Sequence, residues 1–191
     1  MELLLIRHAL PLRVDEGAVE GPADPELSEA GCVQAHALAE WLADEQIDAI
    51  WSSPMRRALG TAAPLAARLG LDVTVDEGLA EYDRHAGSYI PIEELKAEND
   101  PRWYEMPERP EQFVGDVVAA MESIVTAHPG QQVAVVCHGG VINAYAGHVL
   151  GIDAPLFFLP AYTSISRILA SGVGLRSIKS LNESSHVRHL L

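Results

Sequence analysis

The sequence predicts a single α/β domain with a mostly parallel central sheet. Two short, wholly apolar runs, at residues 3–6 and 133–137, are typical of strands that are buried on both faces, as the strands of parallel sheets are. Elsewhere the spacing of the apolar residues alternates between the period of a strand and the period of a helix. The 191 residues suffice for one domain with a full core and one sizeable insertion.

The first quarter of the chain is expected to fold as strand, loop, helix and strand. The strand at 3–6 leads into a loop at 10–25, where three prolines and two glycines exclude regular structure, and we expect this loop to border the site. Ser28 is suited to cap the next helix, and the short apolar run at 47–51 follows as a strand. The apolar face of that helix is predicted to consist of Ala35, Leu38, Ala39 and Leu42.

A second helix is predicted from Pro54 to about Leu69. Proline suits the first helical position, Ser53 can cap it, and Gly70 is a typical helix end. A strand at 71–75 completes a β-α-β-α-β pattern. The buried face of this helix is expected to carry Leu59, Ala62, Ala63 and Ala66.

Residues from about 77 to 110 interrupt the alternation. They hold Pro91, Pro101, Pro107 and Pro110 together with the aromatic residues Tyr82, Tyr89, Trp103 and Tyr104, and they show no sustained helical stripe. An irregular insertion of this size in a compact domain is usually functional, so we expect an ordered flap over the site.

The alternation resumes after the flap and continues to residue 180. A helix with Phe113, Val117 and Ile124 on one face is expected to precede the strand at 133–137. A helix at 140–150 and strands near 164–170 and 174–179 complete a domain that spans 1–180. The polar tail at 181–191 is predicted to be loose.

Composition excludes several classes of function. A formal charge of −14 disfavours contact with nucleic acid or with an anionic membrane surface, because no compensating basic patch is evident. No apolar run is long enough for a signal-peptide core or a membrane span. Cys32 and Cys137 do not form a disulfide framework, and Cys137 is expected to be a core side chain, so we expect a soluble cytoplasmic protein.

Three short motifs bring cations and imidazoles to one place. Arg7 and His8 follow the first strand, and His138 follows the strand at 133–137. Ligands of parallel α/β sheets bind beyond the carboxyl ends of such strands, so the two histidines are expected to meet. Arg56 and Arg57 fall in the opening turns of the second helix, and only one of them can face the site because neighbours on a helix point about 100° apart. Guanidinium groups match tetrahedral oxyanions, which indicates a phosphate pocket.

Four ordered blocks resemble the signature of the histidine phosphatase superfamily, also called the phosphoglycerate mutase-like family. These blocks are Leu-Ile-Arg-His at 5–8, Ser-Ser-Pro-Met-Arg-Arg-Ala at 52–58, Leu-Ala-Glu-Tyr-Asp at 79–83 and Val-Cys-His-Gly-Gly at 136–140. The resemblance implies a three-layer α/β/α sandwich with the flap inserted. It also implies a phosphomonoester hydrolase that acts through a phosphohistidine on His8, without a metal or another cofactor, on a small phosphorylated substrate.

The same resemblance implies roles for individual residues. Arg7, Arg57, His138 and the backbone of Gly139 would bind the phosphate together with His8, and Glu81 would donate a proton to the leaving group. The register of the motif selects Arg57 for the site, so Arg56 is expected to be solvated. Ala9 stands where the family commonly has glycine, and Gly60 where it commonly has glutamine. The run Leu-Pro-Leu-Arg at 10–13 lacks the pattern of the glycolytic mutases, which favours a phosphatase over a mutase.

The same residue types are compatible with two other classes of function, and further residues are candidates for contact with the substrate. His8, Glu81 and His138 are also ligand types of a metallohydrolase, although the neighbouring arginines would repel a divalent cation. A catalytically silent module that binds a phosphorylated ligand is a further possibility. Candidate substrate contacts in the loop and the flap are Arg13, Tyr82 and His85, while surface positions are expected for His36, His128, His186 and His189.

Overall fold

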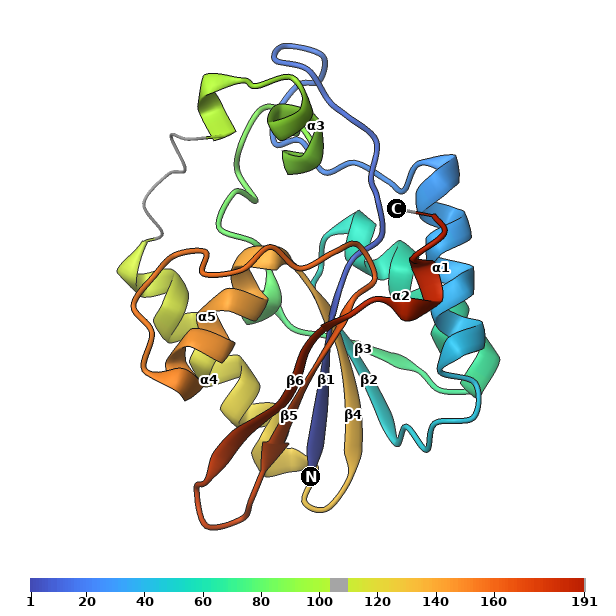
Figure 1. The fold of residues 1–191 in the computed structure, drawn as a ribbon, viewed down its shortest axis with the longest axis vertical. Helices are drawn as coiled ribbons and strands as arrows, with labels where there is room; N and C mark the ends of the chain where they lie inside the picture. The colour runs from blue at the N-terminus through green and yellow to red at the C-terminus, as the bar shows by residue number, and fades with distance from the viewer. Residues whose placement is uncertain (104–109, 191) are drawn as a thin grey trace.

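A six-stranded sheet with the order β3-β2-β4-β1-β5-β6 forms the centre of the molecule (Figure 1). The computed structural model describes residues 1–103 and 110–190. The inner strands β1 and β4 pair in parallel, as do β4 with β2 and β2 with β3, while β5 and β6 are antiparallel to their neighbours. The sheet is therefore mostly parallel, as predicted. Its strands are β1 (Glu2–Arg7), β2 (Ala49–Ser52), β3 (Val73–Val75), β4 (Gln132–Cys137), β5 (Ile165–Ala170) and β6 (Arg176–Glu183).

Helices cover both faces of the sheet, which gives the three layers that the family resemblance implied (Figure 1). Side chains of β1 alternate between two separate apolar clusters because successive residues of a strand point to opposite faces. Leu3 and Leu5 pack with α4 and α5, whereas Leu4 and Ile6 pack with α1 and α2. In the part of the chain described, no helix has the length and apolar character needed to cross a membrane. The helices are α1 (Glu29–Trp41), α2 (Arg56–Leu69), α4 (Glu111–Ala127) and α5 (Gly139–Leu150).

The start of α2 differs from the prediction. The helix begins at Arg56 instead of Pro54, and its cap residue is Met55. The hydroxyl of the predicted cap Ser53 accepts from the N–H of Met55 at 3.3 Å and also contacts His138. Its buried stripe is also rotated, because Ala63 is exposed and Leu59 only half-buried. The far end agrees with the prediction, since Gly70 closes the helix with a φ of +68°. The stripe that packs on the sheet consists of Arg57, Ala58, Thr61, Ala62, Leu65 and Ala66.

The flap lies beyond the ends of β1 and β4, beside the loop that follows β1 (Figure 1). It contains one short helix that the sequence did not predict, α3 (Ile92–Ala97), and two single turns of 3₁₀-helix, at Glu77–Leu79 and Pro101–Trp103. A bridge between Val14 and Tyr89 pairs the loop with the flap. The predicted flap residues Tyr104 and Pro107 lie outside the described residues.

The carboxyl-terminal segment is more ordered than predicted. Strand β6 continues to Glu183, and a 3₁₀ turn follows at Ser185–Val187. His186, expected at the surface, is buried and stacks on Trp41 of α1 with ring centroids 5.8 Å apart. The expected loose tail is therefore wrong for residues 181–187, because apolar and aromatic contacts with α1 fix this polar stretch.

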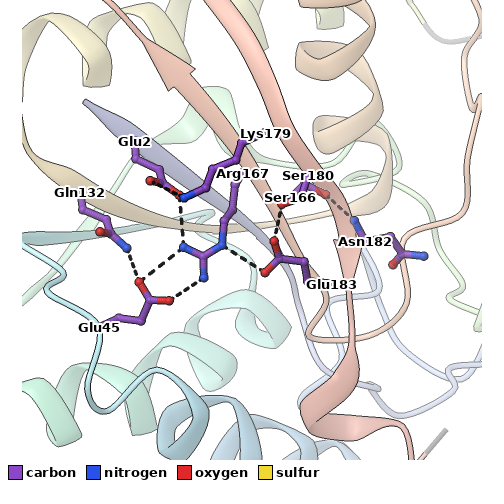
Figure 2. Close-up of polar contacts among 9 residues, drawn as sticks. All are labelled: Glu2, Glu45, Gln132, Ser166, Arg167, Lys179, Ser180, Asn182 and Glu183. Atoms are coloured by element: carbon purple, nitrogen blue, oxygen red, sulfur yellow. Dashed lines mark hydrogen bonds and ion pairs between the residues drawn. The ribbon is translucent and has the colours of Figure 1, made fainter.

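An ion-pair network joins the antiparallel strands to the rest of the sheet (Figure 2). Arg167 on β5 lies with its side chain only 9% exposed among three carboxylates. Its guanidinium is 2.7 Å from Glu45, 3.1 Å from Glu183 and 3.2 Å from Glu2, whose carboxylate also pairs with Lys179. The guanidinium of Arg167 thus joins β1 and β6 to the segment between α1 and β2.

Candidate active site

The ends of β1 and β4 place two histidines side by side. In the parallel register Arg7 lies opposite Cys137, and the backbone N–H of His8 donates to the carbonyl of Cys137 at 2.9 Å. The rings of His8 and His138 consequently lie with centroids 5.1 Å apart, as the sequence predicted. Cys137 itself is fully buried in the core beneath them, and burial raises the pKa of its thiol.

The ring of His8 is held in one orientation. Its Nδ1 lies 2.8 Å from the carbonyl oxygen of Ala9, and since a carbonyl can only accept, Nδ1 carries the hydrogen. The other nitrogen, Nε2, then has a free lone pair. Burial lowers the pKa of His8 well below its ordinary value, and the charges of Arg57 and Arg7 lower it further. At neutral pH the ring is therefore uncharged, which is the state a nucleophile requires.

Two arginines flank this imidazole from different elements. Arg7 of β1 donates at 2.6 Å to Glu93 of α3 and to the carbonyl of Pro160, and its guanidinium lies 3.9 Å from the ring centre of Tyr162. The hydroxyl of Tyr162 donates to the same Glu93 carboxylate at 2.6 Å. Arg7 is therefore held by Glu93 of the flap and by Tyr162 of the segment between α5 and β5, neither of which the sequence predicted as a site residue.

Arg57 of α2 is 1% exposed and only partly satisfied. Its Nη2 lies 3.3 Å from Asp83 of the flap, but its Nε and Nη1 are buried without a hydrogen-bond partner. Buried donors are rarely left unpaired, because each lost hydrogen bond costs about 1–3 kcal/mol. An oxyanion in the adjoining cavity is the kind of group that would satisfy them. Arg56 is exposed and pairs with Glu26, as its predicted orientation requires.

Glu81 enters the site from the flap as a buried carboxyl group. Its two oxygens accept from the backbone N–H of Gly140 at 2.8 Å and of Tyr82 at 3.1 Å. Burial, with a smaller effect of the nearby Asp83, raises the pKa of Glu81 from 4.5 to about 7. A Cβ at position 140 would lie 2.2 Å from Glu81 Oε1, so any larger residue there would displace the carboxyl group from this position. The start of α5 thus both binds and makes room for this carboxyl group.

His138 caps α5 just behind His8. It is fully buried and does not line the adjoining cavity, while Gly139, the first residue of α5, does. Its Nε2 lies 2.7 Å from the hydroxyl of Ser53, and its Nδ1 is buried without a partner. The same hydroxyl accepts from the N–H of Met55 at 3.3 Å, so Ser53 joins His138 to the start of α2. Burial, followed by the charges of Arg57, lowers the pKa of His138.

A cavity of about 190 Å³ opens between these groups and the flap. Arg7, His8, Arg57 and Glu81 line one part of it, together with the predicted substrate contact Tyr82. A second wall comes from the segment between α5 and β5, which the sequence analysis did not connect with the site because its prolines give no regular pattern. The residues that this segment contributes are Pro155, Leu156 and Leu159.

Two other predicted substrate contacts lie outside this cavity. Arg13 is at the surface, where it donates to Asp15 at 2.8 Å and to Glu94 at 3.2 Å. His85 is exposed and is not among the described residues of the cavity wall. The loop after β1 places Asp24 3.9 Å from Arg57 and pairs through Val14 with Tyr89, which lines the cavity. Across the described residues, no three acidic, histidine or cysteine side chains gather closely enough to hold a metal ion.

Comparison with known proteins agrees with this geometry. A family model of the histidine phosphatase superfamily (branch 1) matches residues 3–184. Phosphoserine phosphatase 1 of Hydrogenobacter thermophilus is 32% identical over 169 residues, which cover 83% of this chain and 80% of that protein. A metal-independent phosphoserine phosphatase of Arabidopsis thaliana is 31% identical over 158 residues, 75% of this chain and 66% of that protein.

Solved structures show the same fold. The mycobacterial glucosyl-3-phosphoglycerate phosphatase in complex with VO3 superimposes with a TM-score of 0.75, at 25% identity, over 96% of this chain and 99% of that one. The matched family region includes both strand ends, the flap and the start of α5. The chain therefore belongs to branch 1 of the histidine phosphatase superfamily.

Proposed function

We propose that the protein hydrolyses phosphomonoesters by way of a phosphoryl group carried on Nε2 of His8. The observation that carries this proposal is the pairing of an uncharged, oriented imidazole with a buried carboxyl group across one cavity. The first can attack phosphorus, and the second can hold a proton near pH 7. Phosphatases among the relatives support the same reaction class.

In the first step Nε2 of His8 forms a bond to phosphorus while the bond from phosphorus to the ester oxygen breaks. The departing alkoxide takes the proton of Glu81. Arg7 and the orphan donors of Arg57 face the non-bridging oxygens, whose charge must be stabilised in the transition state. We assign His138 and the amide of Gly139 to the same phosphate pocket, since the ring packs beside His8 and Gly139 lines the cavity at the positive end of α5.

In the second step a water molecule attacks the phosphohistidine. The carboxylate of Glu81 accepts a proton from that water, the bond from phosphorus to Nε2 breaks, and inorganic phosphate leaves. The carboxyl group and the imidazole are then restored. No step requires a metal ion, because the arginines supply the positive charge and Glu81 supplies the proton.

The experiment is to trap the intermediate. Brief reaction with a ³²P-labelled phosphomonoester, in the presence of a metal chelator, should leave acid-labile and alkali-stable label on the wild-type protein. His8→Ala should carry none, while His36→Ala, which removes an exposed histidine of α1, should label like the wild type. Turnover without label on the protein would refute the covalent mechanism. Transfer of label to a second ester instead of water would show a mutase.

A further inference from the structure

One half of the cavity is apolar, and the proposed chemistry assigns no function to it. Five aliphatic side chains line it, from two segments that are far apart in the sequence. None of the five belongs to the main core clusters, and each keeps part of its surface exposed. They are Ile90, Ile92 and Leu95 of the flap with Leu156 and Leu159 of the segment between α5 and β5.

Polar groups that could recognise a polar alcohol are scarce around this apolar half. The described lining includes no serine, threonine, asparagine, glutamine or lysine, and its hydroxyl groups are those of Tyr82 and Tyr89. The ring of Tyr89 packs against the guanidinium of Arg57 at the charged end, with its centroid 4.7 Å away. Asp83 is bound to Arg57, and Arg102 is bound to Asp100 by two hydrogen bonds of 2.9 and 2.6 Å. A sugar, or the ammonium and carboxylate of an amino acid, would lose water here without equivalent partners, which costs free energy.

We propose that the preferred substrates are phosphomonoesters with an apolar alcohol, namely small alkyl or aryl phosphates. This inference rests on the proposed function and names its substrate class. The phosphate would occupy the charged end, between Arg7 and Arg57, and the hydrocarbon would cover the aliphatic wall. A cavity of about 190 Å³ is smaller than the roughly 300–1,000 Å³ of sites for drug-sized ligands, which limits the hydrocarbon to a short chain or a single ring.

A series of straight-chain alkyl phosphates tests this directly. Ethyl, butyl and hexyl phosphate have leaving groups of nearly equal acidity, so a change in kcat/KM along the series measures contact with the hydrocarbon. Each fully buried methylene is worth up to about fourfold. Burial in an open cavity is incomplete, so we expect less than the full increment: kcat/KM should rise at least about tenfold from ethyl to hexyl phosphate. O-phospho-L-serine should be the poorest substrate.

Variants locate the effect on the cavity wall. Leu156→Asn and, independently, Ile90→Asn should flatten the dependence on chain length, measured within each variant as the ratio of kcat/KM for hexyl phosphate to kcat/KM for ethyl phosphate. Leu175→Asn is the matched control, because Leu175 is 71% exposed on the turn between β5 and β6, away from the cavity. That variant should keep the wild-type slope.

The possible results separate this inference from the proposed function. Absence of hydrolysis for every ester, including p-nitrophenyl phosphate, would overturn the proposed function itself. Hydrolysis with a flat chain-length profile, or with phosphoserine preferred over butyl phosphate, would leave the function standing and overturn the apolar specificity. A slope that survives in both asparagine variants would also overturn it.

Discussion

Glu81→Gln tests the assignment of the general acid. The substitution keeps the size of the side chain and removes its titrating proton. With an ordinary pKa of 4.5 a carboxyl group would be protonated in about 0.3% of molecules at pH 7, whereas a pKa of about 7 leaves about half of the molecules protonated. Burial thus increases the supply of the acid form more than a hundredfold.

The expected loss depends on the leaving group. General acid catalysis contributes about 10²- to 10⁴-fold, and it matters only where the departing oxygen is a strong base. Glu81→Gln should therefore lower kcat/KM for ethyl phosphate by about two to four orders of magnitude, and for p-nitrophenyl phosphate by less than about tenfold. In the wild type, kcat/KM for ethyl phosphate should fall about tenfold for each pH step above 7 as Glu81 loses its proton.

Steady-state kinetics with both substrates between pH 5 and 9 provides the measurement. Asp83→Asn is the matched comparison, because Asp83 is one of the groups that raise the pKa of Glu81. This variant should move the alkaline fall to lower pH and keep the difference between substrates. Equal losses for both substrates in Glu81→Gln would refute the assignment, and the same comparison would then be made with Glu77.

Three further predictions follow from the structure. Because the pKa of Glu81 is raised in the fold, the protonated carboxyl group stabilises the folded state below pH 4.5, and this stabilisation is lost as the pH rises through 7. The unfolding free energy of wild type relative to Glu81→Gln, measured by urea titration, should therefore fall by about 3 kcal/mol across that window. A difference that stays constant with pH would contradict the raised pKa. Gly140→Ala should displace Glu81 and cause the same loss of activity as Glu81→Gln, large for ethyl phosphate and small for p-nitrophenyl phosphate. Gly139→Ala should not, because among the described residues its Cβ would approach Pro160 alone, at 4.0 Å. Similar kinetics in the two variants would count against the steric argument. Arg167→Met leaves three carboxylates without their shared partner, so it should lower the free energy of unfolding in urea by about 2 kcal/mol. A loss below about 0.5 kcal/mol, the value typical of an exposed ion pair, would show that the network does not stabilise the fold.

The sequence predicted the sheet and the strand-end residues because their signals are local. An apolar run followed at once by a polar residue defines both a buried strand and the place where its chain leaves the sheet. The positions of Arg7, His8 and His138 at one edge of the sheet therefore follow from the amino-acid pattern alone. The start of α2 does not, because the hydroxyl of Ser53 has one partner at Met55, just before the helix, and another at His138, 85 residues away in the sequence.

The partners of Arg7 and the apolar wall of the cavity were harder to predict, because their contacts join residues that are far apart in the sequence. Glu93 and Tyr162 are separated by 69 residues and become partners only because both approach Arg7. Leu156 lies in a segment without a regular period, so nothing local connects it with the flap. The loop after β1, which the sequence predicted to border the site, places Asp24 3.9 Å from Arg57.

The flap's charges connect these poorly predicted contacts with the well-predicted ones. In a chain with a net charge of −14, the two arginines of the site are each opposed by a flap carboxylate, Glu93 on Arg7 and Asp83 on Arg57. These pairs fix the flap over the sheet, and the flap in turn delivers Glu81 to the amide of Gly140. The cations proposed to bind the phosphate therefore also hold the segment that carries the proposed proton donor, so under this mechanism binding and protonation would depend on one arrangement of the flap.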